Sequence, residues 1–242
     1  MFLAFDADIP LYQAASSAEF EMDWGEDIWS LSTDLAEAKD IFRQQVDNIK
    51  KKTGVSQAVF CLTDPHHNFR KDVYPSYKSG RKKTRKPLGY KALCEWLAEE
   101  EETIRKPGLE ADDVCGLLST QPKNKDNCIV VSNDKDLMTI PGLLYRPMND
   151  ELLTITEPEA DKYFYTQCLT GDATDGYPGV PGIGPKKAEA ILGSRPAWSA
   201  VEQAYIKAGL TKDDALQQAR LARILRWSEW DESKGEMILW HP

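Results

Sequence analysis

The chain has 242 residues, which is enough for one large domain or two unequal ones. Its hydrophobic fraction of 41% and charged fraction of 29% are those of a globular protein and exclude a disordered or fibrous chain. The net charge of -9, taken alone, argues against a nucleic-acid binder, because phosphate contacts need an excess of Lys and Arg. The odd number of cysteines, five without a CxxC pair, indicates reduced thiols. No segment predicts a signal peptide or a membrane span, so we expect a cytoplasmic protein.

Four short apolar runs predict buried strands, and segments with helical periodicity separate them. The runs cover residues 2–5, 57–63, 128–132 and 143–145, and the clearest helical segments cover residues 33–51 and 87–102. Continuous apolar strands that alternate with helices predict an α/β fold with a mostly parallel central sheet flanked by helices. We assign this core to residues 1–155. Residues 156–242 read as a helical region, in which only residues 237–240 suggest a strand.

Carboxylates gather where the predicted strands end. Asp6 follows the first run, Asp64 the second, and Asp134 with Asp136 the third, so all four should lie at one edge of the sheet. Two further clusters lie elsewhere in the chain: Glu110, Asp112 and Asp113, and then Asp172 and Asp175. Carboxylates packed together raise one another's pKa and take up protons unless hard divalent cations keep them ionised. A pair of such ions is suited to phosphodiester hydrolysis.

Each cluster also has a reading that needs no metal. Asp134 and Asp136 point the same way from an extended backbone, but Asp134 is equally suited to cap a helix. Glu110 and Asp113 share one face of a predicted helix, which Asp112 reaches only if the first turn is irregular. Acidic residues also favour a helix N-terminus through its dipole. An Asx turn explains Asp172 or Asp175 singly, but explains the pair less well. The coincidence of the clusters favours the metal interpretation.

A basic segment, residues 70–91, interrupts the acidic chain. It holds nine basic residues opposed only by Asp72: Arg70, Lys71, Lys78, Arg81, Lys82, Lys83, Arg85, Lys86 and Lys91. Tyr74 and Tyr77 lie among them, so the segment could hold phosphates while a tyrosine stacks on an unpaired base. The alternative is a solvated run of charge.

A glycine-rich loop covers residues 179–184 and leads into Lys186 and Lys187. Gly179, Gly182 and Gly184 would let the backbone approach a phosphate, and the amides of the following helix would point at it. A tight turn between two helices without a ligand is the alternative. The spacing fits neither a dinucleotide-binding loop nor a P-loop.

The order of these motifs resembles the 5′-nuclease, or flap endonuclease, superfamily. The motifs that carry the resemblance are Asp6, Asp64 with Arg70, Tyr77-Lys78-Ser79-Gly80-Arg81, Glu110-Ala111-Asp112-Asp113, Asp134-Lys135-Asp136, Gly171-Asp172-Ala173-Thr174-Asp175-Gly176 and the glycine-rich loop. They cover nearly the whole chain. The acidic stretch at residues 19–29 and the segments 222–227 and 240–242 resemble the stand-alone 5′-to-3′ exonucleases of short-tailed bacteriophages.

The resemblance implies a PIN-like 5′-nuclease fold and a two-metal site that uses Mg²⁺, with Mn²⁺ as a substitute. The implied ligands are Asp64, Glu110, Asp112 and Asp113 for the first ion, Asp134, Asp136, Asp172 and Asp175 for the second, and Asp6 in the outer shell. Lys78 and Arg81 would contact the scissile phosphate beside Asp112 and Asp134. The implied DNA contacts are Arg70, Tyr77, Lys82 and Lys83 in an arch at residues 66–91, and Gly179, Gly182, Gly184, Lys186 and Lys187. The last five belong to an implied helix-hairpin-helix at residues 165–195 that binds the duplex backbone with a K⁺ ion.

The function implied is metal-dependent 5′-to-3′ hydrolysis of duplex DNA, and of RNA in RNA-DNA hybrids, with 5′-phosphate products. The substrates would carry a 5′ end, a nick or a flap. The setting would be phage replication and breakdown of host DNA in the cytoplasm of the infected bacterium, alongside phage replication proteins. Two rivals remain: a catalytically silent protein that binds DNA structures, and an RNA-cleaving nuclease with a related acidic core.

Overall fold

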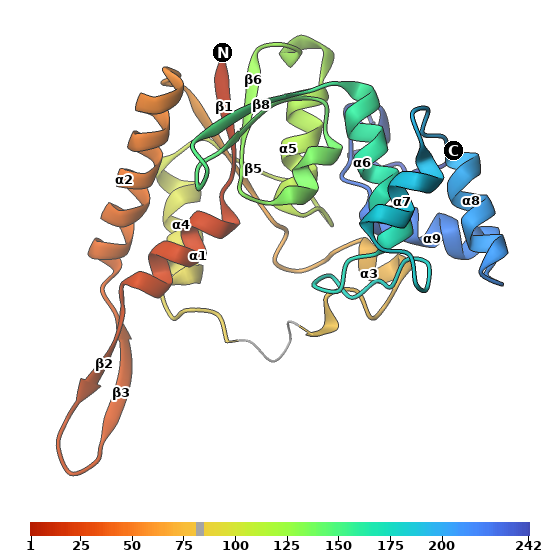
Figure 1. Ribbon diagram of the computed structural model, residues 1–242. Helices are drawn as coiled ribbons and strands as arrows, with labels where there is room; N and C mark the ends of the chain where they lie inside the picture. The colour runs from red at the N-terminus through yellow and green to blue at the C-terminus, as the bar shows by residue number, and fades with distance from the viewer. Residues whose placement is uncertain (81–84) are drawn as a thin grey trace.

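A six-stranded sheet forms the centre of the computed structural model, which describes residues 1–80 and 85–242 (Figure 1). The strand order is β5-β4-β1-β6-β7-β8, and all neighbours are parallel except β7 and β8. The strands are β1 (Phe2–Asp6), β4 (Ala58–Leu62), β5 (Thr103–Arg105), β6 (Cys128–Val131), β7 (Gly142–Arg146) and β8 (Glu151–Ile155). The predicted α/β fold with a mostly parallel sheet is confirmed.

The four predicted strands are the apolar centre of this sheet. Leu3 of β1 pairs with Ala58 on one side and with Ile129 on the other, so β1 lies between β4 and β6. Strands β5 and β8 escaped prediction. The first has only three residues, and the second is largely exposed, so neither contains the continuous apolar run that marks a buried strand.

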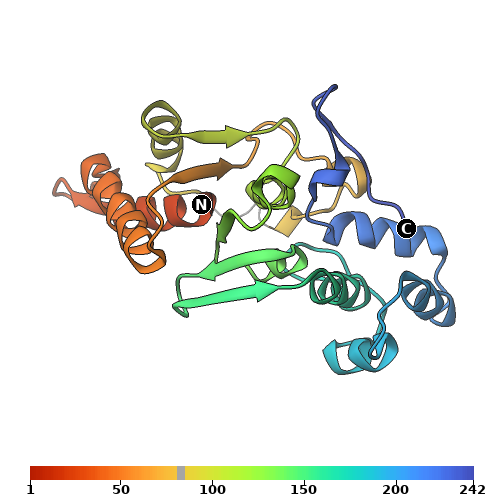
Figure 2. The same ribbon diagram turned by 90° about the horizontal axis from the view of Figure 1, so that it is seen from above.

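Helices cover both faces of the sheet (Figure 2). Three pack together on one face: α1 (Asp8–Ser17), α2 (Leu35–Thr53) and α4 (Tyr90–Glu100). The other face carries α5 (Ala111–Thr120). Local chemistry fixes the ends of α2, because the Asp34 carboxylate accepts hydrogen bonds from two first-turn amides and Gly54 ends the helix at a φ of +70°.

The C-terminal helices form a third cluster beside the sheet (Figure 1). They are α6 (Glu157–Thr170), α7 (Pro185–Leu192), α8 (Trp198–Lys207) and α9 (Lys212–Ala222). Tyr77 is buried in the same cluster, so part of the basic segment belongs to this packing. The predicted C-terminal helical region is therefore present. The strand predicted at residues 237–240 is only a two-residue strand at Glu236–Met237.

The remaining elements are short. They are α3 (Arg70–Val73), the 3₁₀ helices η2 (Pro122–Asn124), η3 (Lys135–Thr139) and η4 (Trp227–Glu229), and the strand pairs β2 (Glu19–Asp23) with β3 (Trp29–Thr33) and β9 (Trp230–Asp231) with β10 (Glu236–Met237). The β2–β3 hairpin, which the sequence did not reveal, projects away from the core (Figure 1). Within the described residues, none of the helices is long and apolar enough for a membrane span.

Candidate active site

The carboxyl edge of the sheet brings together side chains that are far apart in the sequence. Asp6 is the last residue of β1, and the Ser132 hydroxyl just beyond β6 donates a 2.8 Å hydrogen bond to its carboxylate. The same hydroxyl accepts a bond from the Asp134 amide at 3.0 Å. Ser132 therefore joins the ends of two neighbouring strands and holds their carboxylates at one place.

Asp112 points to this place from the first turn of α5. Burial raises its pKa well above the usual range, and the charges of Asp6 and Asp134 raise it further. The pKa of Asp6 rises to about 7, first through burial and then through the charge of Asp8. Three carboxyl groups from three elements thus share one electrostatic environment, in which Asp6 and Asp112 favour protonation when no cation is present.

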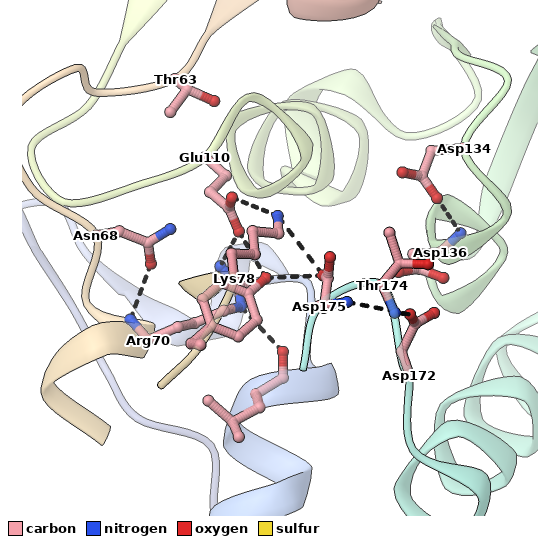
Figure 3. Close-up of polar contacts among 12 residues, drawn as sticks. Thr63, Asn68, Arg70, Lys78, Glu110, Asp134, Asp136, Asp172, Thr174 and Asp175 are labelled. Atoms are coloured by element: carbon pink, nitrogen blue, oxygen red, sulfur yellow. Dashed lines mark hydrogen bonds and ion pairs between the residues drawn. The ribbon is translucent and has the colours of Figure 1, made fainter. Parts of the chain in front are cut away.

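The chain after β6 and the loop after α6 supply the other half of the site (Figure 3). Burial raises the pKa of Asp136 to about 7, and the charge of Asp134 is the next cause. Asp172 and Asp175 also contribute to that rise. We call the seven residues of the two halves the acidic cluster: Asp6, Glu110, Asp112, Asp134, Asp136, Asp172 and Asp175.

Two members of the acidic cluster also have the structural roles considered as alternatives. The Asp134 carboxylate caps η3 by accepting a 2.9 Å bond from the Asp136 amide. The Asp172 carboxylate accepts bonds from the amides of Thr174 and Asp175, as an Asx turn does. Each uses Oδ1 for these bonds, while Oδ2 of Asp172 accepts from Lys135 at 2.8 Å.

Glu110 connects the two halves through Lys78 and Tyr77 (Figure 3). Lys78 Nζ lies 2.5 Å from Glu110 Oε1 and 3.5 Å from Asp175 Oδ2. The Tyr77 hydroxyl lies 2.9 Å from Glu110 Oε2 and 3.0 Å from Asp175 Oδ2. Burial alone would raise the pKa of Glu110, but the charges of Lys78 and Arg70 outweigh it and lower the pKa to about 2.

Asp113, one of the predicted metal ligands, forms a buried ion pair with Arg70 in this structure. Its side chain is fully buried and forms two 2.7 Å bonds with the Arg70 guanidinium. Its two oxygens also accept bonds from the amides of Glu110 and Leu225. Both oxygens of Asp113 are thus engaged, and the residue holds α5 to Arg70 and to the C-terminal segment.

Arg70 and Tyr77, which were predicted as DNA contacts, are also buried in this structure. Arg70 is 2% exposed, and besides Asp113 it donates to the carbonyls of Leu221 and Arg223. Tyr77 is also 2% exposed, so its ring cannot stack on a base. Of the three tyrosines in the basic segment, Tyr74 and Tyr90 keep partial exposure. Arg81, Lys82 and Lys83 lie outside the described residues.

Asp64 lies near the carboxyl edge but holds a loop in this structure. Its two oxygens accept bonds from the amides of His66 and Gly108 at 2.9 and 2.7 Å. These bonds lower its pKa, the bond from Gly108 being the larger cause. The neighbouring Thr63 hydroxyl accepts a 2.9 Å bond from the Ala111 amide and so fixes the start of α5 beside β4.

The glycine-rich loop joins α6 to α7, and its glycines differ in role. Gly179, predicted as a DNA contact, donates its amide to Gln218, and a side chain there would collide with the backbone of Gly171. Gly182 and Gly184 have open space around them. Lys186 and Lys187 are exposed at the start of α7, where the Lys187 ammonium bonds the Gly182 carbonyl at 2.8 Å.

Sequence reasoning missed several supporting residues. Ser132 was recognisable in principle, since a hydroxyl two residues before Asp134 at a strand end can bond that amide. No local sequence pattern indicates Gln167. This residue lies in α6, and its side-chain amide donates a 2.6 Å hydrogen bond to Asp136. Lys135 belongs to the motif Asp134-Lys135-Asp136, but the sequence did not indicate that this 60% exposed side chain pairs with Asp172.

The chemistry of the acidic cluster fits hard divalent cations. Its donors are all carboxylate oxygens. Burial first, and then the charges of neighbouring carboxylates, raise the pKa of Asp6, Asp112 and Asp136. In the described part of the chain, no three His, Cys, Asp or Glu side chains are already arranged around one point as ligands. The ammonium groups of Lys78 and Lys135 lie against Glu110 and Asp172 instead.

Comparison with known proteins places the chain in a family. Residues 33–161 match the model for the 5′-3′ exonuclease, N-terminal resolvase-like domain. The exodeoxyribonuclease of Enterobacteria phage T3 is 33% identical, and the match covers 99% of this chain and 92% of that protein. The chain belongs to the 5′-3′ exonuclease family. The exonuclease of Escherichia phage T7 is also 33% identical, with 99% of this chain and 93% of that protein covered.

A solved structure shares the fold of this exonuclease. It is a pseudo-enzyme-product complex of the bacteriophage T5 flap endonuclease with DNA and metal ions, and it superposes with a TM-score of 0.63. The match covers 92% of this chain and 89% of that one at 14% sequence identity, so it bears on the fold alone. The resemblance to the 5′-nuclease superfamily is confirmed.

Proposed function

We propose that the acidic cluster is the two-metal centre of a 5′-to-3′ exodeoxyribonuclease that uses Mg²⁺. The observation that carries the proposal is the convergence of Asp6, Asp112 and Asp134 from three elements, where burial and neighbouring charges disfavour ionised carboxylates unless cations are bound. Divalent ions there would lower the pKa of an attacking water and stabilise the leaving oxygen. Mn²⁺ is expected to substitute, because it also accepts oxygen ligands in octahedral geometry.

The two regions of the chain would divide the work. Residues 1–155 would carry the hydrolysis, and residues 156–242 would hold the duplex through the open backbone of Gly182 and Gly184 and the charges of Lys186 and Lys187. A K⁺ ion at this loop would have to compete with the Lys187 ammonium for the Gly182 carbonyl. Contacts to phosphate carry no sequence information, so selectivity should be for DNA structure.

The substrate is DNA, as the exodeoxyribonuclease activity of the phage T3 relative and the DNA bound to the T5 flap endonuclease support. We extend the proposal to nicks, flaps and the RNA strand of hybrids, with 5′-phosphate products. The relatives from phages T3 and T7 support a role in phage replication and host DNA breakdown inside the infected cell. A protein that only binds DNA structures would share the basic segment but not the metal requirement.

Cleavage of 5′-labelled duplex is expected to require divalent metal. Mg²⁺ should release labelled nucleotides from the 5′ end, and EDTA should stop release, because the acidic cluster alone cannot activate water. A 3′-labelled duplex of the same sequence is the control for polarity. Binding in both buffers without any label release would refute the nuclease and favour the silent binder. A comparison of blunt, nicked, flapped and hybrid substrates would then measure the structural preference.

Stability of the metal-free protein is expected to fall as the pH rises from about 4 to about 7. Asp6 and Asp136 have folded pKa values of about 7 against an ordinary value of 3.8. The folded state therefore holds their protons more tightly, and the stabilisation of the neutral carboxyls is lost as pH rises through 7. Divalent ions reverse this loss, so Mg²⁺ should raise the Tm more at pH 8 than at pH 5.5. Equal Tm shifts, at ionic strength matched with KCl, would contradict the assignment.

A further inference from the structure

Lys78 occupies the place of a cation between two carboxylates of the acidic cluster (Figure 3). Its Nζ atom lies 2.5 Å from a Glu110 oxygen and 3.5 Å from an Asp175 oxygen. The side chains are only 14%, 13% and 12% exposed, so water screens the three charges little. Lys78 is therefore a buried counter-ion and not a surface charge waiting for DNA.

Tyr77 cannot replace Lys78 in this role. The hydroxyl faces one oxygen of Glu110 and one of Asp175, at 2.9 and 3.0 Å. A phenol has a single proton, so it can donate to only one of these carboxylates at a time. The Lys78 ammonium has three donors, so it can donate to both carboxylates, and its positive charge offsets theirs. The same charge also reduces the rise in the pKa of nearby Asp112.

Arg70, the other buried cation beside Glu110, is locked in place. Both terminal nitrogens of its guanidinium, Nη1 and Nη2, donate to Asp113, and the group also donates to two backbone carbonyls, those of Leu221 and Arg223. Lys78 ends a flexible four-carbon stem, and the described contacts of its ammonium are with carboxylates and the Tyr77 ring. Its backbone has a φ of +52°, a strained conformation for a lysine and one found at switch regions. Of these two buried cations, Lys78 is therefore the one that can move away from Glu110.

The ammonium of Lys78 carries a single positive charge, so a substrate phosphate must compete for it with Glu110 and Asp175. A divalent ion beside Glu110 and Asp175 would repel the ammonium and take over its neutralising role. We propose that Lys78 is the internal counter-ion of the metal-free site, and that a divalent ion displaces it from Glu110 and Asp175 toward the substrate phosphate. This inference rests on the proposed two-metal function. Metal loading would then prepare the phosphate-binding site, and substrate phosphate would favour metal binding in return.

Mn²⁺ binding without DNA tests the competition directly. Lys78→Met removes the competing ammonium, and Lys78→Gln is the second variant should the apolar side chain prevent folding. Both should bind Mn²⁺ more tightly than the unmodified protein, by about tenfold, within the usual range of coupling between sites. The bound ion is measured by electron paramagnetic resonance, after circular dichroism has confirmed the fold.

Lys135→Met is the matched control. It removes one positive charge next to Asp172, but Lys135 is 60% exposed and bridges no second carboxylate among the described contacts. Its effect on Mn²⁺ affinity should be several-fold smaller. An equal gain in Mn²⁺ affinity for Lys78→Met and Lys135→Met would show that the loss of any nearby positive charge has the same effect, and would overturn the proposal. Unchanged or weaker Mn²⁺ binding by both Lys78 variants would overturn it too.

Chemical labelling gives a second readout on the unmodified chain. Acetic anhydride should label Lys78 slowly in EDTA, because the ammonium is buried against carboxylates, and faster once Mg²⁺ is added. Lys91, which is 87% exposed, provides the internal reference rate. A Lys78 rate that Mg²⁺ leaves unchanged would refute displacement while leaving the metal centre intact. Absence of Mn²⁺ binding in every protein would instead refute the metal centre itself.

Discussion

Replacing Asp134 and Asp136 together with Asn is expected to abolish DNA cleavage and spare DNA binding. The two carboxylates belong to the half of the acidic cluster in which Asp136 has a pKa of about 7. Asn keeps the size and the capping oxygen of Asp134, so the start of η3 should survive. The substitutions remove the negative charge that binds the cations, and these cations stabilise the transition state by several kcal/mol. We expect kcat to fall by about 10³-fold or more.

The measurement pairs two assays on one nicked duplex. Single-turnover cleavage in Mg²⁺ reports the chemical step, and fluorescence anisotropy in EDTA reports binding. The control is the double substitution of Asp40 and Asp47 with Asn, which removes the same charge from the exposed side of α2. It should leave both assays unchanged. Normal cleavage by the Asp134 and Asp136 variant would show that the active site lies elsewhere.

The sequence predicted the position of this site through a rule about sheets. Continuous apolar runs marked the parallel strands, and in such sheets the ligand site lies beyond the carboxyl ends. Asp6 ends β1 and Asp134 follows the neighbouring strand β6, so the sequence could predict that they lie close together. The edge strand β8 and the β2–β3 hairpin could not be predicted, because exposed strands contain too few buried residues to give a periodic pattern in the sequence.

The sequence could not tell which acid of an adjacent pair faces the site. Helical periodicity placed Glu110 and Asp113 on one face and set Asp112 apart. In the structure, Asp112 points toward Asp6, while Asp113 points toward Arg70. Partners far along the chain decide this: Arg70 is 43 residues from Asp113, and the amide of Leu225 is 112 residues away. The same distant packing buries Tyr77, whose neighbours in the sequence suggest an exposed binding segment.

Loss of the Arg70 guanidinium is expected to destabilise the fold more than any surface change in the basic segment. Arg70 and Asp113 are 3% and 0% exposed at their side chains, so Arg70→Met leaves a buried carboxylate without its charge partner. Breaking such a pair costs about 3–5 kcal/mol in the free energy of unfolding. Urea denaturation measures this loss, and the exposed Lys71→Met is the matched control.

The double substitution Arg70→Met with Asp113→Leu separates structure from catalysis. It removes both charges together, so much of the lost stability should return, because apolar replacements of a buried ion pair are often tolerated. Asp113→Asn should likewise lower the free energy of unfolding but leave the Mn²⁺ affinity of the folded protein unchanged. Asp134→Asn should lower the Mn²⁺ affinity but leave the free energy of unfolding unchanged. This crossed pattern follows because the oxygens of Asp113 are already engaged by Arg70 and two amides. A large fall in Mn²⁺ affinity in Asp113→Asn would return that residue to the metal site.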